Sequence, residues 1–265
     1  MEAHDKATTA PILVTGGTGT LGRLVVPRLR DAGYDVRVLT RRTKEPEQGV
    51  EYVTGDLETG DGADPAVAGT EIVVNLAGSQ KGDDVKARHL VQAAARAGTR
   101  HLVHISVVGA DRVPVVSGVD RAMFGYFASK LAAERIIADS GVPWTTLRAT
   151  QFHDLMLMTA QGMAKLPVMP VPAGFRFQPV DAGEVADRLV ELALGGPAGL
   201  VPDIAGPQVY SLKDLLGAYL RSRGKHRAML PVRIPGKAAG AFRQGANLAL
   251  DQAVGRRTWE QFLAA

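Results

Sequence analysis

The feature that most constrains how this chain folds is a glycine-rich segment directly after a short apolar run near its start. The run Pro11–Thr15 leads into Gly16, Gly17, Gly19 and Gly22, after which the sequence has a helical pattern. Glycines at this spacing permit a tight turn off a strand, a close approach of the backbone to a pyrophosphate, and close packing of helix on strand. The N–H groups and dipole at the start of that helix attract the pyrophosphate. We therefore expect a strand, turn and helix that bind a dinucleotide, with a glycine turn that binds nothing as the alternative.

Short β-type runs alternate with helical stretches over the first 150 residues. Several of the runs are continuously apolar, as in parallel strands buried on both faces. This alternation predicts an α/β fold whose doubly wound parallel sheet is built from right-handed βαβ units. The expected strands are Pro11–Thr15, Asp35–Thr40, Val50–Thr54, Glu71–Leu76, His101–Ser106 and Trp144–Leu147, and the expected helices are Leu21–Ala32, Val85–Ala97 and Arg121–Ser140.

The pattern loosens after residue 150, where four prolines between residues 167 and 179 interrupt a stretch too broken for a long helix. Further helices are expected at Ala182–Leu194, from Ser211 onward and at Thr258–Leu263. We therefore expect residues 1–150 to form the dinucleotide-binding domain. Residues 151–265 are expected to form a smaller, substrate-binding lobe packed on it as one structural unit.

The end of the second expected strand indicates which dinucleotide binds. It reads Val36–Thr40 followed by Arg41 and Arg42, with no carboxylate at that position. An acid there bonds the ribose 2′-hydroxyl of NAD, whereas arginine accommodates the 2′-phosphate of NADP. Arginine suits phosphate because its planar fork forms two parallel hydrogen bonds. The sequence therefore favours NADP(H), and a solvated basic turn is the alternative.

Two later strand ends fit the same reading. Asp56 and Leu57 follow the third strand, where a carboxylate can accept a hydrogen bond from the adenine amino group. Leu76, Ala77 and Gly78 follow the fourth strand, where small residues let the cofactor approach. Taken alone, each is equally explained as an ordinary turn.

Tyr126 and Lys130 lie four residues apart in an expected helix, which puts both side chains on one face. A nearby ammonium favours the phenolate form of a tyrosine, which makes its hydroxyl a usable proton donor. Such a positioned acid contributes about 10²–10⁴ in rate. We expect Tyr126 to donate a proton to a carbonyl under reduction, and Lys130 to hold the nicotinamide ribose. On spacing alone, a surface pair is the alternative.

At this point the chain resembles the short-chain dehydrogenase/reductase superfamily, and within it the atypical, NmrA-like NAD(P)H-binding branch. The matching segments are TGGTGTLGR (15–23), VLTRR (38–42), GDL (55–57), NLAG (75–78), HISVVGAD (104–111), YFASKLAAE (126–134), PWTTLRATQF (143–152) and PVDAGEVA (179–186). The resemblance implies a Rossmann fold, NADP(H) as cofactor, and Tyr126 and Lys130 as the active pair. It also implies cofactor contacts between Ala149 and Phe152. The full set of expected cofactor contacts is Gly16, Thr18, Gly19, Thr20, Leu21, Arg41, Arg42, Asp56, Leu57, Leu76, Ala77, Gly78, Lys130, Ala149, Thr150 and Phe152.

One position departs from the pattern of the superfamily. There the fifth strand usually ends in two serines, the second of which polarises the substrate carbonyl, whereas here the pair is Ser106 and Val107. Ser106 stays a weak catalytic candidate, because successive strand residues point to opposite faces. Ser117 could enter from the following loop, although nothing in the sequence places it there.

Composition narrows the remaining possibilities. The 265 residues carry a formal net charge of +4 with basic residues in isolated pairs, and include no cysteine. We therefore expect no nucleic-acid partner, no disulfide and no thiol chemistry. No apolar run approaches the roughly 18 residues of a membrane helix, and no signal peptide is visible. We expect a cytoplasmic monomer or homodimer that binds no metal, since His101 and His104 fit a buried strand better than a metal site.

The sequence thus supports two functional hypotheses. The first is an NADPH-dependent oxidoreductase that transfers hydride to a small, largely apolar carbonyl, enone or quinone. The second is a non-catalytic regulatory protein that senses NADP(H); Val107 favours it and the Tyr126–Lys130 pair opposes it. A sugar-nucleotide epimerase is a weaker third reading, because the chain is short for a large sugar-binding lobe.

Overall fold

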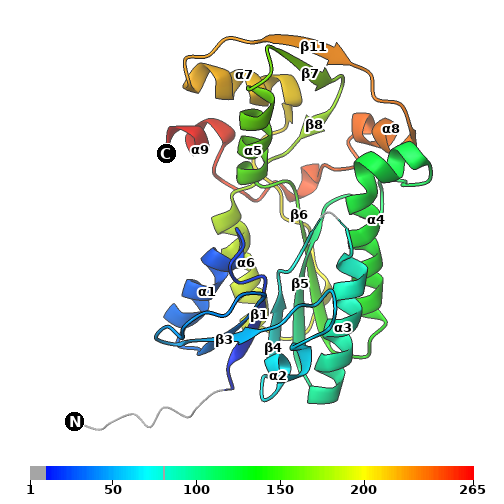
Figure 1. Cartoon of the computed structure of the whole chain (residues 1–265). Coiled ribbons are helices and arrows are strands. Elements are labelled where there is room, and N and C mark those ends of the chain that lie inside the picture. The colour runs from blue at the N-terminus through cyan, green and yellow to red at the C-terminus, as the bar shows by residue number, and fades with distance from the viewer. Residues whose placement is uncertain (1–9, 80) are drawn as a thin grey trace. The chain divides into compact units, whose positions relative to one another are not determined.

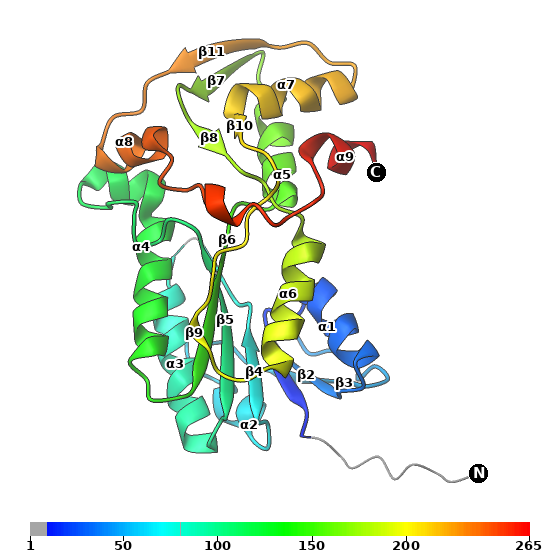
Figure 2. The same ribbon diagram turned by 180° about the vertical axis from the view of Figure 1, so that it is seen from behind.

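The computed structural model describes residues 10–79 and 81–265, and its main feature is a seven-stranded sheet. The strand order is β3-β2-β1-β4-β5-β6-β9, and the paired registers from β3 to β5 and at β6–β9 are parallel. The doubly wound α/β fold expected from the sequence is therefore confirmed (Figures 1 and 2). The strands are β1 (Ile12–Thr15), β2 (Val36–Thr40), β3 (Val50–Thr54), β4 (Ile72–Asn75), β5 (His101–Val107), β6 (Trp144–Ala149) and β9 (Gly199–Leu200).

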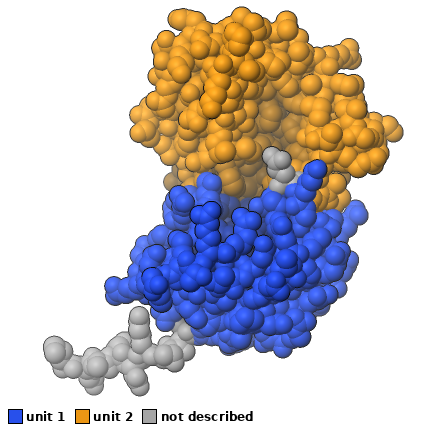
Figure 3. Space-filling view, viewed as in Figure 1, with its two compact units in different colours: residues 1–105, 132–146, 186–200 blue, residues 106–131, 147–185, 201–265 orange. Residues whose placement is uncertain are grey.

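The chain divides into two compact units, each assembled from three segments (Figure 3). Unit 1 comprises residues 1–105, 132–146 and 186–200, and unit 2 comprises residues 106–131, 147–185 and 201–265. Residues 106–131, which precede the expected boundary at 150, thus belong with the C-terminal half. The functional division into a cofactor domain and a substrate lobe stays a prediction.

Unit 1 contains the strand ends that position the expected nucleotide site. Thr15 of β1 is in register with Leu39 of β2 and with Asn75 of β4, which in turn is in register with His104 of β5. Parallel strands aligned in this way end at one edge of the sheet. The loops that follow β1, β2 and β4 therefore leave the sheet at the same level.

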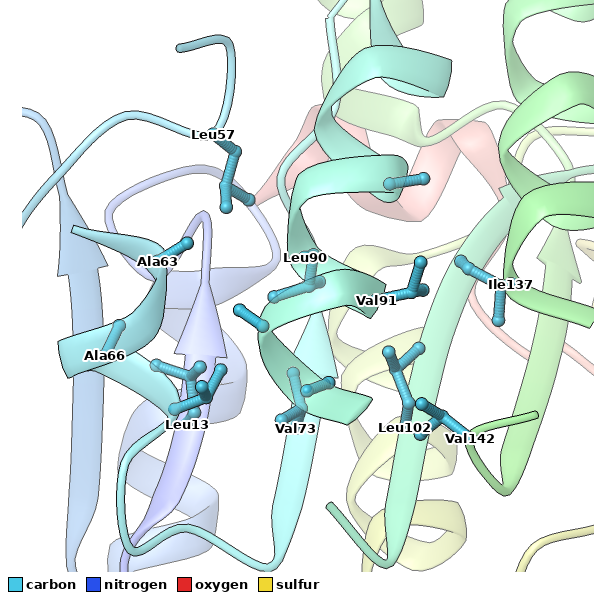
Figure 4. Close-up of a cluster of buried hydrophobic side chains, with 14 of the residues drawn as sticks. Leu13, Leu57, Ala63, Ala66, Val73, Leu90, Val91, Leu102, Ile137 and Val142 are labelled. Carbon is cyan, nitrogen blue, oxygen red and sulfur yellow. The ribbon is translucent and has the colours of Figure 1, made fainter. Parts of the chain in front are cut away.

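The core of unit 1 lies between the sheet and the helices on one of its faces (Figure 4). Leu13, Val73 and Leu102 of three adjacent strands pack against Leu90 of α3 and Ile137 of α4, all of them fully buried. On the opposite face α1 and α6 lie side by side, joined by an ion pair of 2.6 Å between Arg28 and Asp187 (Figures 1 and 2). The helices are α1 (Gly22–Asp31), α2 (Ala63–Val67), α3 (Asp83–Ala97), α4 (Gly118–Ala138) and α6 (Ala182–Leu194).

Unit 2 has two apolar cores of its own. One surrounds the fully buried Trp259 and joins α5, α7 and α9; the other gathers aromatic side chains of α4 and α8. The expected helix starts are present: Ser211 accepts a hydrogen bond from the Asp214 N–H, and Thr258 forms a capping box with Gln261. The elements are α5 (His153–Met163), β7 (Val168–Pro172), β8 (Arg176–Phe177), β10 (Tyr210–Ser211), α7 (Leu212–Ser222), β11 (Ala228–Val232), α8 (Lys237–Gln244), a 3₁₀ turn (Leu250–Gln252) and α9 (Trp259–Ala264).

Candidate functional site

The glycine-rich loop after β1 packs so tightly that three of its glycines have no room for a side chain. Gly16 has φ +67°, and a Cβ there would lie 2.7 Å from the carbonyl carbon of Leu76. A Cβ on Gly17 would lie 2.7 Å from Cγ1 of Val38 on β2, and one on Gly22 would overlap the carbonyl oxygen of Gly16. The loop backbone thus lies against both neighbouring strands, and the expected roles of these glycines have a direct steric basis.

The same loop presents unsatisfied backbone donors to solvent. Thr18, Gly19 and Thr20 are exposed, and the turn is closed by a 3.0 Å hydrogen bond from the Gly19 N–H to the Gly16 carbonyl. Within residues 10–79 and 81–265, the N–H groups of Thr18, Thr20 and Leu21 donate to no protein acceptor. Donors held in this way at the start of α1 suit a pyrophosphate.

Arg23 is a loop-stabilising residue that sequence reasoning missed. Its Nε donates to the Thr18 carbonyl at 2.9 Å, so its guanidinium lies across the exposed turn. The positive charge at this position adds to the dipole of α1. The only sequence signal was a basic residue directly after the last loop glycine.

Arg41 and Arg42 follow β2 and are both exposed. Neither forms an ion pair with a carboxylate in the described part of the chain, whereas Arg37 on the same strand bonds Glu51 at 2.7 Å. The Arg42 N–H donates to the Thr40 hydroxyl at 3.3 Å, which fixes the direction of the turn. Two exposed guanidinium groups at this strand end suit a phosphate. The expected contact with the 2′-phosphate of NADP stays a prediction.

Asp56 and Leu57 follow β3 in a tight turn. One carboxylate oxygen of Asp56 accepts the Glu58 N–H at 2.8 Å, and the Asp56 carbonyl accepts the Gly60 N–H at 2.8 Å. The Leu57 side chain is buried in the core of unit 1, and its carbonyl lies 2.8 Å from Nδ1 of His89. Both residues therefore have structural roles here, and a contact with adenine stays a prediction.

A buried polar network lies beneath the end of β4, where Leu76, Ala77 and Gly78 begin. The Thr15 hydroxyl donates to Oδ1 of Asn75 at 2.7 Å, and Nδ2 of Asn75 lies 3.1 Å from Nδ1 of His104. The Ala77 N–H also reaches the Thr15 hydroxyl, at 3.3 Å. This network joins the ends of β1 and β4 to the middle of β5, and it lies next to the Leu76–Gly78 segment, which packs against Gly16 of the glycine loop.

Tyr126 and Lys130 lie in unit 2, one helical turn apart on α4. Nζ of Lys130 is 5.7 Å from the centre of the Tyr126 ring, and the lysine is only 4% exposed. The tyrosine is half-buried, and its ring packs edge-on against Phe127 with the centres 5.7 Å apart. The pair expected from the spacing is therefore together on one helix face, and the burial of Lys130 is unlike that of a surface lysine.

Val107 belongs to the apolar cluster of unit 2 against which Tyr126 packs. The neighbouring Ser106 is 4% exposed, and its hydroxyl has no hydrogen-bond partner in the described part of the chain. The Ser117 hydroxyl is committed elsewhere, because it donates to Asp120 at 2.8 Å and caps α4. The Ser117 hydroxyl is therefore not available to take the place of the catalytic serine that the superfamily usually has at position 107. The roles of Ser106 and Val107 stay predictions.

The last expected cofactor contacts are Ala149, which ends β6, and Thr150 and Phe152, which follow it. Thr150 is 2% exposed and donates from its hydroxyl to the Gln178 carbonyl at 2.6 Å. The Thr150 N–H donates to the Ile204 carbonyl at 3.0 Å, and Phe152 forms the N-cap of α5. Hydrogen bonds therefore hold the backbone at Thr150, while direct contact with a cofactor stays a prediction.

The buried histidines have structural partners. His101 Nε2 lies 2.8 Å from the Thr145 hydroxyl, and His153 Nε2 donates to the Arg257 carbonyl at 3.0 Å. Burial lowers the pKa of each of these imidazoles below the ordinary value. Among residues 10–79 and 81–265 no group of three or more metal-binding side chains occurs. No helix of the described chain is long and apolar enough to cross a membrane.

Comparison with known proteins identifies related sequences and folds. A family model described as NAD(P)H-binding matches residues 16–192. The chain is 31% identical over 256 residues to (4-alkanoyl-5-oxo-2,5-dihydrofuran-3-yl)methyl phosphate reductase of Streptomyces griseus, covering 89% of this chain and 86% of that protein. It is 25% identical to Quinone oxidoreductase 2 of Escherichia coli, covering 81% of this chain and 75% of that protein. The crystal structure of the NADPH complex of that E. coli enzyme superposes with a TM-score of 0.79 at 19% identity, covering 96% and 98% of the two chains.

Proposed function

The chain belongs to the NAD(P)H-binding family, and from this premise we propose that it is an NADPH-dependent oxidoreductase acting on a small, largely apolar carbonyl, enone or quinone. Membership confirms the resemblance drawn from the sequence motifs. The observation that carries the proposal is that one chain contains both a glycine loop whose N–H groups lack acceptors among the described residues and a half-buried Tyr126 next to the buried Lys130.

The residues of unit 1 fit a dinucleotide. The loop glycines leave a surface of backbone donors at Thr18, Thr20 and Leu21, and Arg23 adds positive charge beside them. When bound, NADPH supplies the hydride. The protein's part is to hold the pyrophosphate on these donors and to fix the nicotinamide relative to the substrate.

Arg41 and Arg42 support NADPH over NADH. Two exposed guanidinium groups that form no ion pair among residues 10–79 and 81–265 lie where β2 ends. A 2′-phosphate satisfies them, whereas a 2′-hydroxyl leaves them with water alone.

Tyr126 is the proposed proton donor. Hydride adds to the carbonyl carbon of the substrate, or to the far carbon of a conjugated system, and the oxygen that gains charge takes the phenolic proton. The ammonium of Lys130, held 5.7 Å from the ring centre, stabilises the phenolate that remains. Lys130 is also proposed to orient the nicotinamide ribose.

The substrate class follows from the surroundings of Tyr126. Val107, Phe124 and Phe127 are buried members of the apolar cluster against which the half-buried Tyr126 packs, so the surroundings of Tyr126 are apolar. Without a serine hydroxyl at position 107, the protein polarises a carbonyl weakly. We therefore favour acceptors that are already activated by conjugation, in keeping with the oxo-dihydrofuran and quinone in the names of the relatives. These relatives are named as reductases, so a non-catalytic sensor is not favoured.

A cytoplasmic location and a monomeric or homodimeric state stay predictions. The direct experiment is NADPH oxidation by the purified chain with a panel of aldehydes, ketones, enones and quinones, with NADH as the control. We expect turnover on enones or quinones that exceeds turnover on simple ketones. NADPH binding with no oxidation on any class overturns the proposed activity.

A further inference from the structure

A pocket of about 710 Å³ opens on unit 2, where α5 and α7 end and β7 and β11 begin. Its lining includes five basic side chains, those of Lys165, Arg221, Lys225, His226 and Arg227, and contains no carboxylate. In the sequence, the basic residues from Arg221 to Arg227 are typical of a solvated helix end. The structure adds Lys165 to it and gives it a concave shape.

The fold brings these charges together from distant parts of the chain. Strands β7 and β11 are parallel, with Val168 in register with Ala228 (Figures 1 and 2). The residues that precede the two strands, 165–167 and 225–227, therefore start from adjacent positions. Nε of Arg227 donates to the carbonyl of Ala164 at 3.1 Å, which joins the two segments directly.

These positive charges lack protein partners. None of the five basic side chains forms an ion pair within the described residues, although Arg28 and Arg96 elsewhere each bond an aspartate at 2.6 Å. The C-terminus of a helix carries about −0.5 charge, and basic residues near it are therefore favoured. The ends of α5 and α7 together offset about one of the four full charges of the lysines and arginines. An excess of about three positive charges remains for a ligand.

The two arginines are held in position for an anion. Nε and Nη1 of Arg227 donate to the carbonyls of Ala164 and His226, which leaves Nη2 for a ligand. Arg221 lies back over its own helix, since a Cβ on Gly217 would be 3.2 Å from its Nη1. A guanidinium held as that of Arg227 is matches phosphate oxygens better than an ammonium group does.

We propose that this pocket binds a ligand with two or more phosphate-type negative charges, at a site made entirely within unit 2. Its volume lies in the range of small-molecule sites, roughly 300–1,000 Å³. This binding does not rest on the proposed oxidoreductase activity, because none of its residues is among those assigned to the cofactor or to proton transfer.

Inorganic pyrophosphate is the probe that tests the proposal. Calorimetric titration of the full chain without NADPH, whose own phosphates would compete for the pocket, should show a pyrophosphate site at constant ionic strength that remains in Gly22→Ala, where the glycine loop is blocked. The variant Arg221→Gln/Lys225→Gln should bind pyrophosphate about tenfold or more weakly, a change of about 1.4 kcal/mol or more. Arg223→Gln is the matched control, because Arg223 is exposed in the same segment but outside the pocket lining; its affinity should stay within about twofold.

A second arm distinguishes a free phosphate compound from a lipid headgroup, since Leu166 and Leu230 are exposed near the pocket residues in sequence. Flotation with cardiolipin vesicles, whose headgroup carries two phosphates, that is lost in the double variant and kept in Arg223→Gln assigns the site to headgroups. Pyrophosphate binding without flotation assigns it to a free compound. Either result supports a phosphate site. No pyrophosphate binding, or equal loss in Arg223→Gln and the double variant, overturns the proposal, provided that thermal unfolding shows both variants to be folded.

Discussion

Nζ of Lys130 lies 5.7 Å from the centre of the Tyr126 ring, and the lysine that carries it is 96% buried by its own helix and its surroundings. A buried ammonium has a desolvation cost that a surface lysine avoids, so its position requires compensation from neighbouring groups. In the proposed reaction that ammonium stabilises the developing phenolate and holds the ribose of NADPH.

Replacing Lys130 should therefore affect two steps at once. We expect Lys130→Met to lower kcat by about 10²-fold or more and to raise the Kd for NADPH, because it removes both a stabilising charge and a ribose contact. Steady-state kinetics with fluorescence titration of NADPH separates the two effects. Lys213→Met, on the exposed face of α7, is the control. A loss of kcat with unchanged NADPH affinity would remove the ribose role.

Arg41 and Arg42 should determine the choice between NADPH and NADH. We expect Arg41→Gln/Arg42→Gln to weaken NADPH binding by about tenfold or more for each arginine lost while leaving NADH binding nearly unchanged, because a charge-assisted hydrogen bond contributes about 1.5–3 kcal/mol. Arg96→Gln/Arg100→Gln, at two other exposed arginines, gives the matched loss of two charges. An equal loss of affinity for NADPH and NADH would show that Arg41 and Arg42 do not bind the 2′-phosphate.

The packing of the glycine loop predicts different outcomes for two alanine variants. Gly22→Ala places its Cβ against the backbone of Gly16 and Gly17, which has no room to move, so NADPH binding should be lost. Gly17→Ala meets the side chain of Val38 instead. Adding Val38→Ala should restore NADPH affinity to Gly17→Ala and leave Gly22→Ala unchanged. Rescue of both variants, or of neither, would contradict the packing described for this loop.

His153 should make the stability of the chain depend on pH. Burial lowers the pKa of His153 below the ordinary value of 6.5, and Arg257 lowers it further, against the opposing effects of the Arg257 carbonyl, Asp181 and Asp154. The unfolded chain then binds a proton at a pH where the folded chain does not, so stability falls as pH drops below about 6.5. Chemical unfolding at pH 7.5 and pH 5 measures the loss. His153→Gln keeps a donor for the Arg257 carbonyl, and its free energy of unfolding should fall less between pH 7.5 and pH 5 than that of the parent chain. The pKa of His101 is also lowered, so His101 accounts for part of the pH dependence that remains in this variant.

The sequence predicted those parts of the fold that depend on local patterns. The apolar runs of β1, β2 and β4 and the helix Ala182–Leu194 appear where their periodicity places them. Helix α5 was missed because its Leu155–Met158 segment lacks the polar–apolar contrast that marks a helix face. Strands β7 and β11 were missed for another reason: they pair across about 60 residues, and β7 contains prolines that read as breaks.

The candidate site shows the same division between local and distant information. The glycine spacing and the Tyr126–Lys130 pair are local and could be found in the sequence. The contact of Gly17 with Val38, the network of Thr15, Asn75 and His104, and the basic pocket on unit 2 depend on which strands become neighbours. No single stretch of sequence carries that information.

The measurement that tests the central claim most directly is a comparison of turnover and NADPH binding in Tyr126→Phe. Loss of the phenolic proton donor should reduce turnover on the best acceptor by about 10²–10⁴-fold, with the Kd for NADPH within about twofold of the parent chain. Tyr34→Phe, in which a half-buried tyrosine of unit 1 loses its hydroxyl, should keep full activity. Unchanged turnover in a folded Tyr126→Phe that still binds NADPH would contradict the assignment of Tyr126 and the mechanism built on it.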